Sequence, residues 1–272
     1  MLRSDFHIHT SFSTDSNAPM EDVIKRSIAL GLTDIAITDH MDFDFPEDVA
    51  KDAGGNFMFD VKEHLKVFTG LKESFSRDIN LYYGIEMGFM DNADDFYNDL
   101  LKTYPFDFNI GSLHIVDDMD PYFQKYWDNM GSAAAGIERY LSQILSSIKR
   151  FKNYDSLGHA DYIFRVAPGK KEYEYGEYAD YFDEILKVLI TDGKALEVNT
   201  AGYKYGLGVP NPRPCVLKRY KELGGELITV GSDAHAPEQL AYDYKKCEAL
   251  LKELGYKYVF IYKDHKPEGY TI

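Results

Sequence analysis

The first candidate chemical group is a pair of histidines near the start of the chain. In MLRSDFHIHTSFSTD, His7 and His9 stand one residue apart and Asp15 follows. Alternate residues of a strand face the same side, so two imidazoles spaced in this way can bind one metal ion. The later segment GSDAH offers Asp233 and His235 at the same spacing. Imidazole and carboxylate together favour Zn, Mn, Fe or Co over Ca or Mg, and a set without thiolate argues against a closed structural zinc site.

Similar residues stand at the ends of most of the predicted strands, and six of the eight histidines are among them. These residues are His7, His9, His40, Glu86, His114, His159, Glu197, Asp233 and His235. A single histidine or acid at a strand end is usually structural, as a helix cap or a hydrogen-bonding group. In a parallel barrel, however, the strand ends converge on one mouth, where active sites are built. Nine candidate ligands exceed the need of one ion, so we expect two or three ions that share a bridging carboxylate.

Strand-like and helix-like segments alternate along the whole chain. Strands are predicted at residues 2–9, 33–40, 79–89, 106–116, 155–162, 194–200, 226–235 and 256–264. Helices are predicted at residues 17–31, 61–75, 93–104, 136–151, 178–193, 214–225 and 237–255, with loops at 41–60 and around Trp127. This alternation predicts a parallel sheet, and the number of units predicts a barrel within a single domain over residues 1–272. An open doubly wound sheet is the structural alternative.

Composition narrows the class of protein. The chain has 272 residues, of which 44% are hydrophobic, and a net charge of −15. This charge argues against binding to nucleic acid, which requires clustered cations, whereas a small anionic substrate remains compatible because a metal ion reverses the local sign. Cys215 and Cys247 lack metal-ligand spacing, so we expect a reduced, cytoplasmic protein. The first residues do not form a signal peptide, and no apolar run is long enough to span a bilayer.

Six short segments together resemble one known family. HIHTSFSTD, ITDH, GIEMGF, SLH, GHADY and GSDAH, in this order from His7 to His235, are similar to the PHP (polymerase and histidinol phosphatase) superfamily. Chain length and the segment LEVNTAGYKYG resemble its free-standing histidinol-phosphate phosphatases. The resemblance implies an α/β fold, a distorted TIM-like (β/α)7 barrel, holding three divalent transition-metal ions (Zn, Mn or Fe). The eighth predicted strand carries no convincing site residue, so we expect it outside the ring.

The resemblance also implies a role for each matching position. The first ion would be held by His7, His9, Glu86 and Asp233, the second by Glu86, His114 and His159, and the third by Asp15, His40 and His235. Glu86 would thus bridge two ions. The family tends to have arginine where this chain has Lys204, and lysine lacks the fork that binds phosphate in a bidentate manner.

The reaction expected from this site is hydrolysis of a phosphate monoester, with L-histidinol phosphate as the preferred substrate. The nucleophile would be a hydroxide that bridges two metal ions. Arg165, Lys204 and Arg213 are the candidate phosphate contacts, although a surface ion pair is the preferred interpretation of Arg213. Asp233 or His235 could protonate the leaving group, and we favour Asp233.

Contacts to the rest of the substrate are less constrained by the sequence. Asp42, Asp44 and Asp117 are candidates for binding an amine, and Phe43 or Tyr203 for packing on an imidazole. His64 and His265 are interpreted as structural. Three alternatives stay open: a PHP phosphoesterase acting on a phosphotyrosine or nucleotide, an amidohydrolase-type C–N hydrolase, and a non-enzymatic metal-binding protein. In the preferred interpretation the partner is a small phosphate ester, without nucleic acid or membrane.

Overall fold

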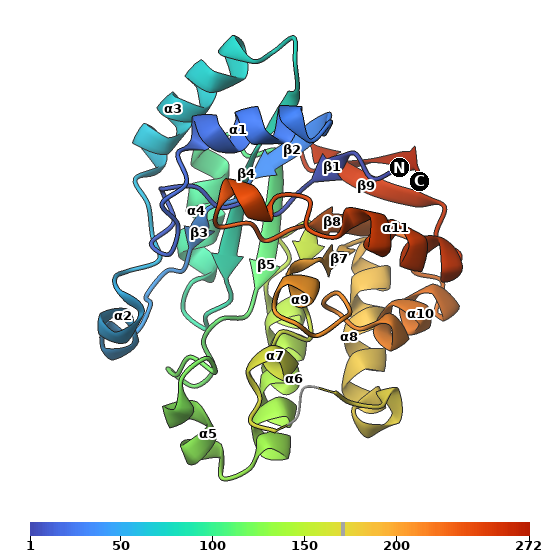
Figure 1. Cartoon of the computed structure of the whole chain (residues 1–272). Helices are drawn as coiled ribbons and strands as arrows, with labels where there is room; N and C mark the ends of the chain where they lie inside the picture. The colour runs from blue at the N-terminus through green and yellow to red at the C-terminus, as the bar shows by residue number, and fades with distance from the viewer. Residues whose placement is uncertain (170–171) are drawn as a thin grey trace.

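Parallel strands form a nearly closed ring in the computed structural model, which describes residues 1–169 and 172–272 (Figure 1). The strands of the ring are β1 (Ser4–Asp5), β2 (Asp34–Ile37), β3 (His40–Met41), β4 (Asn80–Gly88), β5 (Phe108–Ser112), β6 (Ser156–Leu157), β7 (Ala195–Asn199) and β8 (Ile228–Gly231). β2 pairs with the first half of β4 and β3 with its second half, so these two strands fill one position of seven. The predicted (β/α)7 barrel is therefore confirmed over an open sheet.

Backbone contacts between β8 and β1 bring the two ends of the ring together. Ile8 forms a parallel bridge with Ala234, and the Phe6 amide donates to the Val230 carbonyl at 2.9 Å. Beyond the strands proper, the Asp233 amide donates to the His7 carbonyl at 2.8 Å. This seam places the residues that follow β8 beside those that follow β1.

Helices cover the outside of the ring (Figure 1). The longer ones are α1 (Met20–Ala29), α3 (Val61–Ser74), α4 (Asp94–Thr103), α6 (Ala133–Arg150), α8 (Ala179–Asp192), α10 (Pro214–Glu222) and α11 (Tyr244–Glu253). Their apolar faces are buried, and side chains cap the first turns of α3 and α6: Asp60 accepts the amides of Lys62 and Glu63, and Ser132 accepts that of Ala135. Among the described residues, none of the helices has the length and apolar character that a membrane crossing needs.

Several short helices were not predicted, because segments this short give little periodic signal. They are α2 (Glu47–Ala53), α5 (Gln124–Met130), α7 (Ile163–Val166), α9 (Ala201–Lys204) and η1 (Tyr175–Glu177). The predictions of loops at 41–60 and around Trp127 are therefore wrong. The helix predicted at 237–255 is confirmed over α11, but its first part is the separate short helix η2 (Pro237–Gln239), because Ala241 and Asp243 adopt positive φ angles of 52° and 51° between the two.

An antiparallel hairpin of β9 (Tyr258–Lys263) and β10 (Lys266–Thr271) lies outside the ring, as expected for the eighth predicted strand. It packs near the first residues of the ring strands. The Tyr270 hydroxyl lies 2.8 Å from Ser4 Oγ, and the Tyr262 ring centroid lies 5.3 Å from that of Phe108. The second strand was missed because KPEGYT contains proline and glycine and is largely exposed.

The turn of this hairpin predicts a pH-dependent contribution to stability. His265 Nδ1 lies 2.8 Å from Asp155 Oδ2, and this hydrogen bond raises the pKa of His265 above its ordinary value of 6.5. A raised folded-state pKa stabilises the fold fully below the unfolded-state pKa, and the contribution disappears as the pH rises through the folded-state value. Wild type should therefore lose its stability advantage over His265→Ala as the pH rises from below 6.5 through the raised pKa of His265.

Denaturant unfolding of both proteins across that range measures the difference. Asp155→Asn is the matched control. In that background His265 has no carboxylate partner, so adding His265→Ala should cause no pH-dependent change in stability. A difference between wild type and His265→Ala that stays constant with pH would contradict the assignment.

Candidate metal centre

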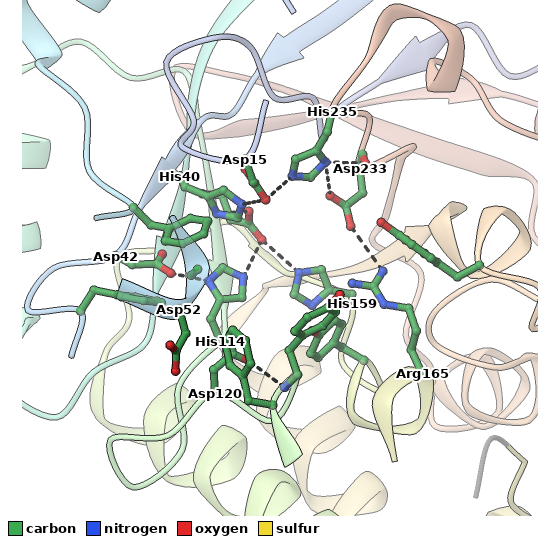
Figure 2. Close-up of a pocket in the computed structure, with 18 of the residues that line it drawn as sticks. Asp15, His40, Asp42, Asp52, His114, Asp120, His159, Arg165, Asp233 and His235 are labelled. Carbon is green, nitrogen blue, oxygen red and sulfur yellow. Dashed lines mark hydrogen bonds and ion pairs between the residues drawn. The ribbon is translucent and has the colours of Figure 1, made fainter. Parts of the chain in front are cut away.

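A cavity of about 540 Å³ lies where the strands of the ring end (Figure 2). Seven of the predicted ligands line it: Asp15, His40, Glu86, His114, His159, Asp233 and His235. His7 and His9 are fully buried beside them. The structure thus brings all nine predicted ligands together from both ends of the chain.

Four of these side chains converge on one point. His7 Nε2 and His9 Nε2 lie 3.1 Å apart, and Glu86 Oε2 lies 3.2 and 3.4 Å from them. Asp233 Oδ1 lies 3.8 Å from His7 Nε2 and 3.5 Å from His9 Nε2. These are the residues that the family resemblance grouped around a first ion.

The other two predicted groups also form, and they overlap with the first. Glu86 Oε1 lies 3.2 Å from His114 Nε2 and 3.0 Å from His159 Nε2. Asp15 Oδ2 lies 3.0 Å from His235 Nε2 and 3.7 Å from His40 Nε2. Four overlapping triads of potential ligand atoms, each within 4.8 Å, run through the cluster. Glu86 is therefore placed to bridge.

Regular backbone geometry explains most of these positions. His7 and His9 project to one side of the extended chain after β1, while Ile8 is buried on the other. His40 and Glu86 are direct partners in the parallel register of β3 and β4. Asp233 departs from this pattern, since its φ of 52° is in the left-handed region, which is costly for a residue with a side chain.

Hydrogen-bond acceptors behind the cluster determine which ring nitrogen of His7 and of His114 points into the cluster. Nδ1 of His7 donates to Glu197 Oε1 at 2.6 Å, and Nδ1 of His114 to Asp42 Oδ2 at 2.7 Å. Glu197 also accepts the backbone amide of His159 at 2.7 Å. With the proton held on Nδ1, the Nε2 lone pair of the neutral ring points into the cluster, as a metal ligand requires. Glu197, which the sequence analysis listed among the candidate ligands at strand ends, is thus an acceptor behind the cluster.

The cluster fits divalent cations because several of its buried ligand atoms have no hydrogen-bond partner among the described residues. Glu86 Oε2 and His40 Nδ1 lie 3.0 Å apart, yet within the described chain neither has a hydrogen-bond partner. The buried Nδ1 of His159 has none either. Donor types agree with this interpretation, because imidazole nitrogen and carboxylate oxygen suit Zn, Mn or Fe.

The pKa values of the histidines also indicate that the buried carboxylates favour positive charge beside them. Burial opposes protonation of His114, but Asp42 and Glu86 outweigh it and raise the pKa of His114 to about 10. His9 differs, because burial and then the charges of His235 and His40 lower its pKa to about 3. The buried carboxylates therefore need cations beside them, and metal ions would supply the charge while leaving the imidazoles neutral.

The predicted phosphate contacts have different surroundings. Arg165 lines the cavity, with its guanidinium 4.3 and 4.2 Å from the ring centroids of Tyr162 and Tyr205 and 3.9 Å from Asp233 Oδ2. Lys204 does not line it, because its ammonium donates to the Asp233 carbonyl and Gln239 Oε1, each at 3.0 Å. Lys204 thus supports the backbone beneath Asp233, and its direct contact with phosphate stays a prediction.

Arg213 also lies outside the cavity lining. Its guanidinium is 3.8 Å from Glu172 Oε1, and its backbone amide donates to Asp161 Oδ2. Arg213 thus forms an ion pair, as the preferred interpretation expected, although its side chain is largely buried, and a phosphate contact at this position stays a prediction.

Most of the loop side chains that line the cavity were not predicted from the sequence. Of the proposed amine ligands, Asp42 lines the cavity but bonds His114, Asp44 bonds Asn92 and Asp117 bonds Arg139. Phe43 stacks on Phe96 and Tyr203 lies beside Lys246, and neither lines the cavity. The lining instead includes Asp52, Asp120, Phe45, Phe57, Tyr122 and Phe123. Nothing in their local sequence distinguishes these residues from other loop positions.

Comparison with known proteins agrees with this site. Residues 5–201 match the model of the PHP domain family. A histidinol-phosphatase of Lactococcus lactis subsp. lactis is 31% identical over 264 residues, covering 94% of this chain and 93% of that protein. A protein of Clostridium acetobutylicum described as a probable histidinol-phosphatase is 30% identical over 260 residues, covering 95% and 96%.

The structural comparison covers almost the whole fold. A crystal structure of histidinol phosphate phosphatase from Lactococcus lactis subsp. lactis, complexed with zinc, L-histidinol and phosphate, superposes with a TM-score of 0.88. The two chains are 29% identical, and the match covers 98% of each.

Close packing behind the first group predicts the effect of adding one methyl group at Gly231. A Cβ there would lie 2.3 Å from His7 Cβ and 2.7 Å from Glu197 Oε1. Gly231→Ala should therefore reduce the free energy of unfolding by about 1–3 kcal/mol, as overpacking in a core does. Chemical denaturation measures it. Gly70→Ala is the control, since its Cβ would meet no atom within 4 Å in α3 and should stabilise the helix by up to ~1 kcal/mol. Equal effects at the two sites would contradict the packing argument.

Proposed function

The chain belongs to the PHP domain family, and from this we propose that it is a metal-dependent phosphatase that hydrolyses L-histidinol phosphate to L-histidinol and phosphate. The observation that carries the proposal is the convergence of nine imidazole and carboxylate side chains at the mouth of the barrel, with Arg165 beside them. Full-length similarity to histidinol-phosphatases supports the choice of substrate.

We assign the ligands as three sets. They are His7, His9, Glu86 and Asp233; Glu86, His114 and His159; and Asp15, His40 and His235. Divalent Zn, Mn or Fe ions in these sets would supply a deprotonated water as nucleophile and neutralise charge on the phosphoryl group. The chain keeps most of the ligands away from bulk water. The acceptors Glu197 and Asp42 hold the protons on Nδ1 of His7 and His114, so that these imidazoles can bind a cation in their neutral form.

Arg165 is the proposed phosphate contact. Its position between Tyr162 and Tyr205 fixes the plane of the guanidinium, and its nearest carboxylate oxygen, Asp233 Oδ2, is 3.9 Å away. A guanidinium held in this way offers two parallel N–H groups to a phosphoryl oxygen pair. Lys204 contributes indirectly, by holding the backbone of Asp233.

Asp233 is the proposed proton donor to the leaving alkoxide, with His235 as the second candidate. Asp233 Oδ1 faces His7 and His9, whereas Oδ2 faces Arg165 and the amide of Asn199 at 3.4 Å. One carboxylate thus borders both the ligand cluster and the proposed phosphate position. A proton carried there would be delivered beside the bond that breaks.

The cavity also suits the organic part of this substrate. Aromatic rings of Phe45, Phe57, Tyr122 and Phe123 line it and can pack on an imidazole. Asp120 accepts the amide of Tyr122, and among the described residues no cation forms an ion pair with it. Burial raises the pKa of Asp120, as expected for a carboxylate that lacks a positive partner. We assign Asp120 to the substrate ammonium.

Three wider predictions accompany this function. We infer that residues 1–272 act as one domain, supported by a single hydrophobic cluster that includes residues from Leu2 to Tyr270. The free cysteines Cys215 and Cys247 support a reducing, cytoplasmic location. The acidic net charge supports a small-molecule partner rather than nucleic acid. A phosphotyrosine or a nucleotide is the alternative substrate; a nucleotide, or a phosphotyrosine within a peptide chain, has no ammonium for Asp120 to bind.

Metal dependence is the first test of this function. Chelation should abolish phosphate release from L-histidinol phosphate, and zinc or manganese should restore it. His114→Ala should lower kcat/KM by at least ~100-fold, because even outer partners of metal ligands are worth about 10–100-fold. His265→Ala, which changes a histidine far from the cavity, is the matched control. Near-full activity of His114→Ala would refute the ligand assignment, and activity of equal size on nucleotides would refute the substrate.

Asp120 provides a test of substrate recognition. Asp120→Asn should lower kcat/KM for L-histidinol phosphate by about 10–100-fold, the effect of losing a hydrogen bond to a charged group. The analogue that lacks the amino group, imidazolylpropyl phosphate, should be hydrolysed equally by both proteins. Asp117→Asn is the control, since that carboxylate bonds Arg139 away from the cavity. Equal losses on both substrates would show that Asp120 does not bind the ammonium.

A further inference from the structure

A further buried histidine, outside the proposed ligand sets, lies behind the metal centre without lining the cavity. His64, on α3, is fully buried, and its ring centroid lies 4.8 Å from that of Phe12 and 4.5 Å from that of Phe59. A polar ring in such surroundings is costly unless its nitrogens are hydrogen-bonded. Nε2 lies 3.0 Å from Asp39 Oδ2, and Nδ1 lies 3.3 Å from the Tyr83 hydroxyl.

Asp39 collects four hydrogen bonds and has no water exposure. Its carboxylate accepts the amide of Thr10 at 2.6 Å, the hydroxyl of Thr10 at 2.7 Å and the hydroxyl of Ser13 at 2.5 Å, in addition to His64 Nε2. His64 must therefore carry its proton on Nε2 in this contact. The carboxylate anchors the loop that follows β1, which carries Thr10 and Ser13.

Ser13 connects Asp39 to a proposed metal ligand. Its hydroxyl hydrogen is donated to Asp39, so Ser13 Oγ acts as an acceptor toward its other neighbours. Those neighbours are the His40 amide at 3.1 Å and His9 Nδ1 at 3.0 Å. His9 therefore carries its proton on Nδ1, and its Nε2 lone pair is left for the first ligand group.

We propose that His64 is a positioning residue of the metal centre, which acts through Asp39 and Ser13 to fix the tautomer and ring orientation of His9. The inference rests on the metal-binding part of the proposed function. Without the Nε2–H donor, the buried Asp39 carboxylate loses one of four hydrogen bonds. Ser13 is then less firmly held as an acceptor, and His9 is less well prepared to bind a cation.

The test is zinc affinity of the full-length protein, measured at fixed pH by competition with a chromophoric chelator after metal removal. His64→Leu, which removes the donor at similar volume, should weaken zinc binding by about 10-fold or more. His64→Gln can present an amide N–H to Asp39 and should recover most of the affinity. Tyr83→Phe removes only the other hydrogen bond of His64 and should bind zinc like wild type.

A double-substitution series tests the route of the effect. Ser13→Ala should weaken zinc binding by itself, and adding His64→Leu should cause little further loss, because both changes break one relay. Multiplicative losses would overturn the relay through Ser13. Unchanged affinity in His64→Leu would overturn the positioning role alone, whereas absence of zinc binding in wild type would overturn the proposed function as well.

If His64→Leu does not fold, the tautomer of His9 in the metal-free wild type decides the question. Nitrogen NMR of the histidine rings should show His9 protonated on Nδ1. Protonation on Nε2 would overturn the proposal.

Discussion

The carboxylate of Glu86 is the group on which the arrangement of this molecule depends. It is fully buried, and its two oxygens lie within 3.4 Å of imidazole nitrogens of His7, His9, His40, His114 and His159. A charge in that position is stable only with cations or protons around it. The barrel supplies this environment because its strands end at the same level, so that one side chain from the middle of the sheet can meet partners from both sides.

Around this centre lies a layer of acceptors that sets the state of the ligands. Glu197, Asp42 and Ser13 each accept from Nδ1 of a different imidazole. Glu197 comes from β7, which carries no assigned ligand, whereas Asp42 and Ser13 lie in the segments after β3 and β1 that also follow ligands. The orientation of His7 therefore depends on a strand that contributes no ligand itself. Gly231 belongs to the same layer, since only a residue without Cβ lets β8 approach His7 and Glu197. The site is thus determined as much by what packs behind it as by its ligands.

The sequence allowed the ligand cluster to be predicted because the ligands obey a simple rule. All except Asp15, which the family resemblance supplied, follow or end a strand, and parallel topology brings strand ends together regardless of the loops. Arg165 could be proposed because it comes six residues after His159. Lys204 and Arg213 could not be placed, because the direction of a long side chain depends on acceptors such as the Asp233 carbonyl and Glu172. Asp120 and the aromatic rings were missed because they lie on segments whose course is set by tertiary contacts.

The seam between β1 and β8 has a consequence for how the protein is made. More than two hundred residues separate His7 and His9 from their partners Asp233 and His235, so the partners are synthesised much later. Because domains generally fold as units, the ring cannot close before the segment that carries Asp233 has been made. The backbone contacts that close the ring are also those that bring Asp233 beside His7 and His9, so the ring and the first ligand group are completed together.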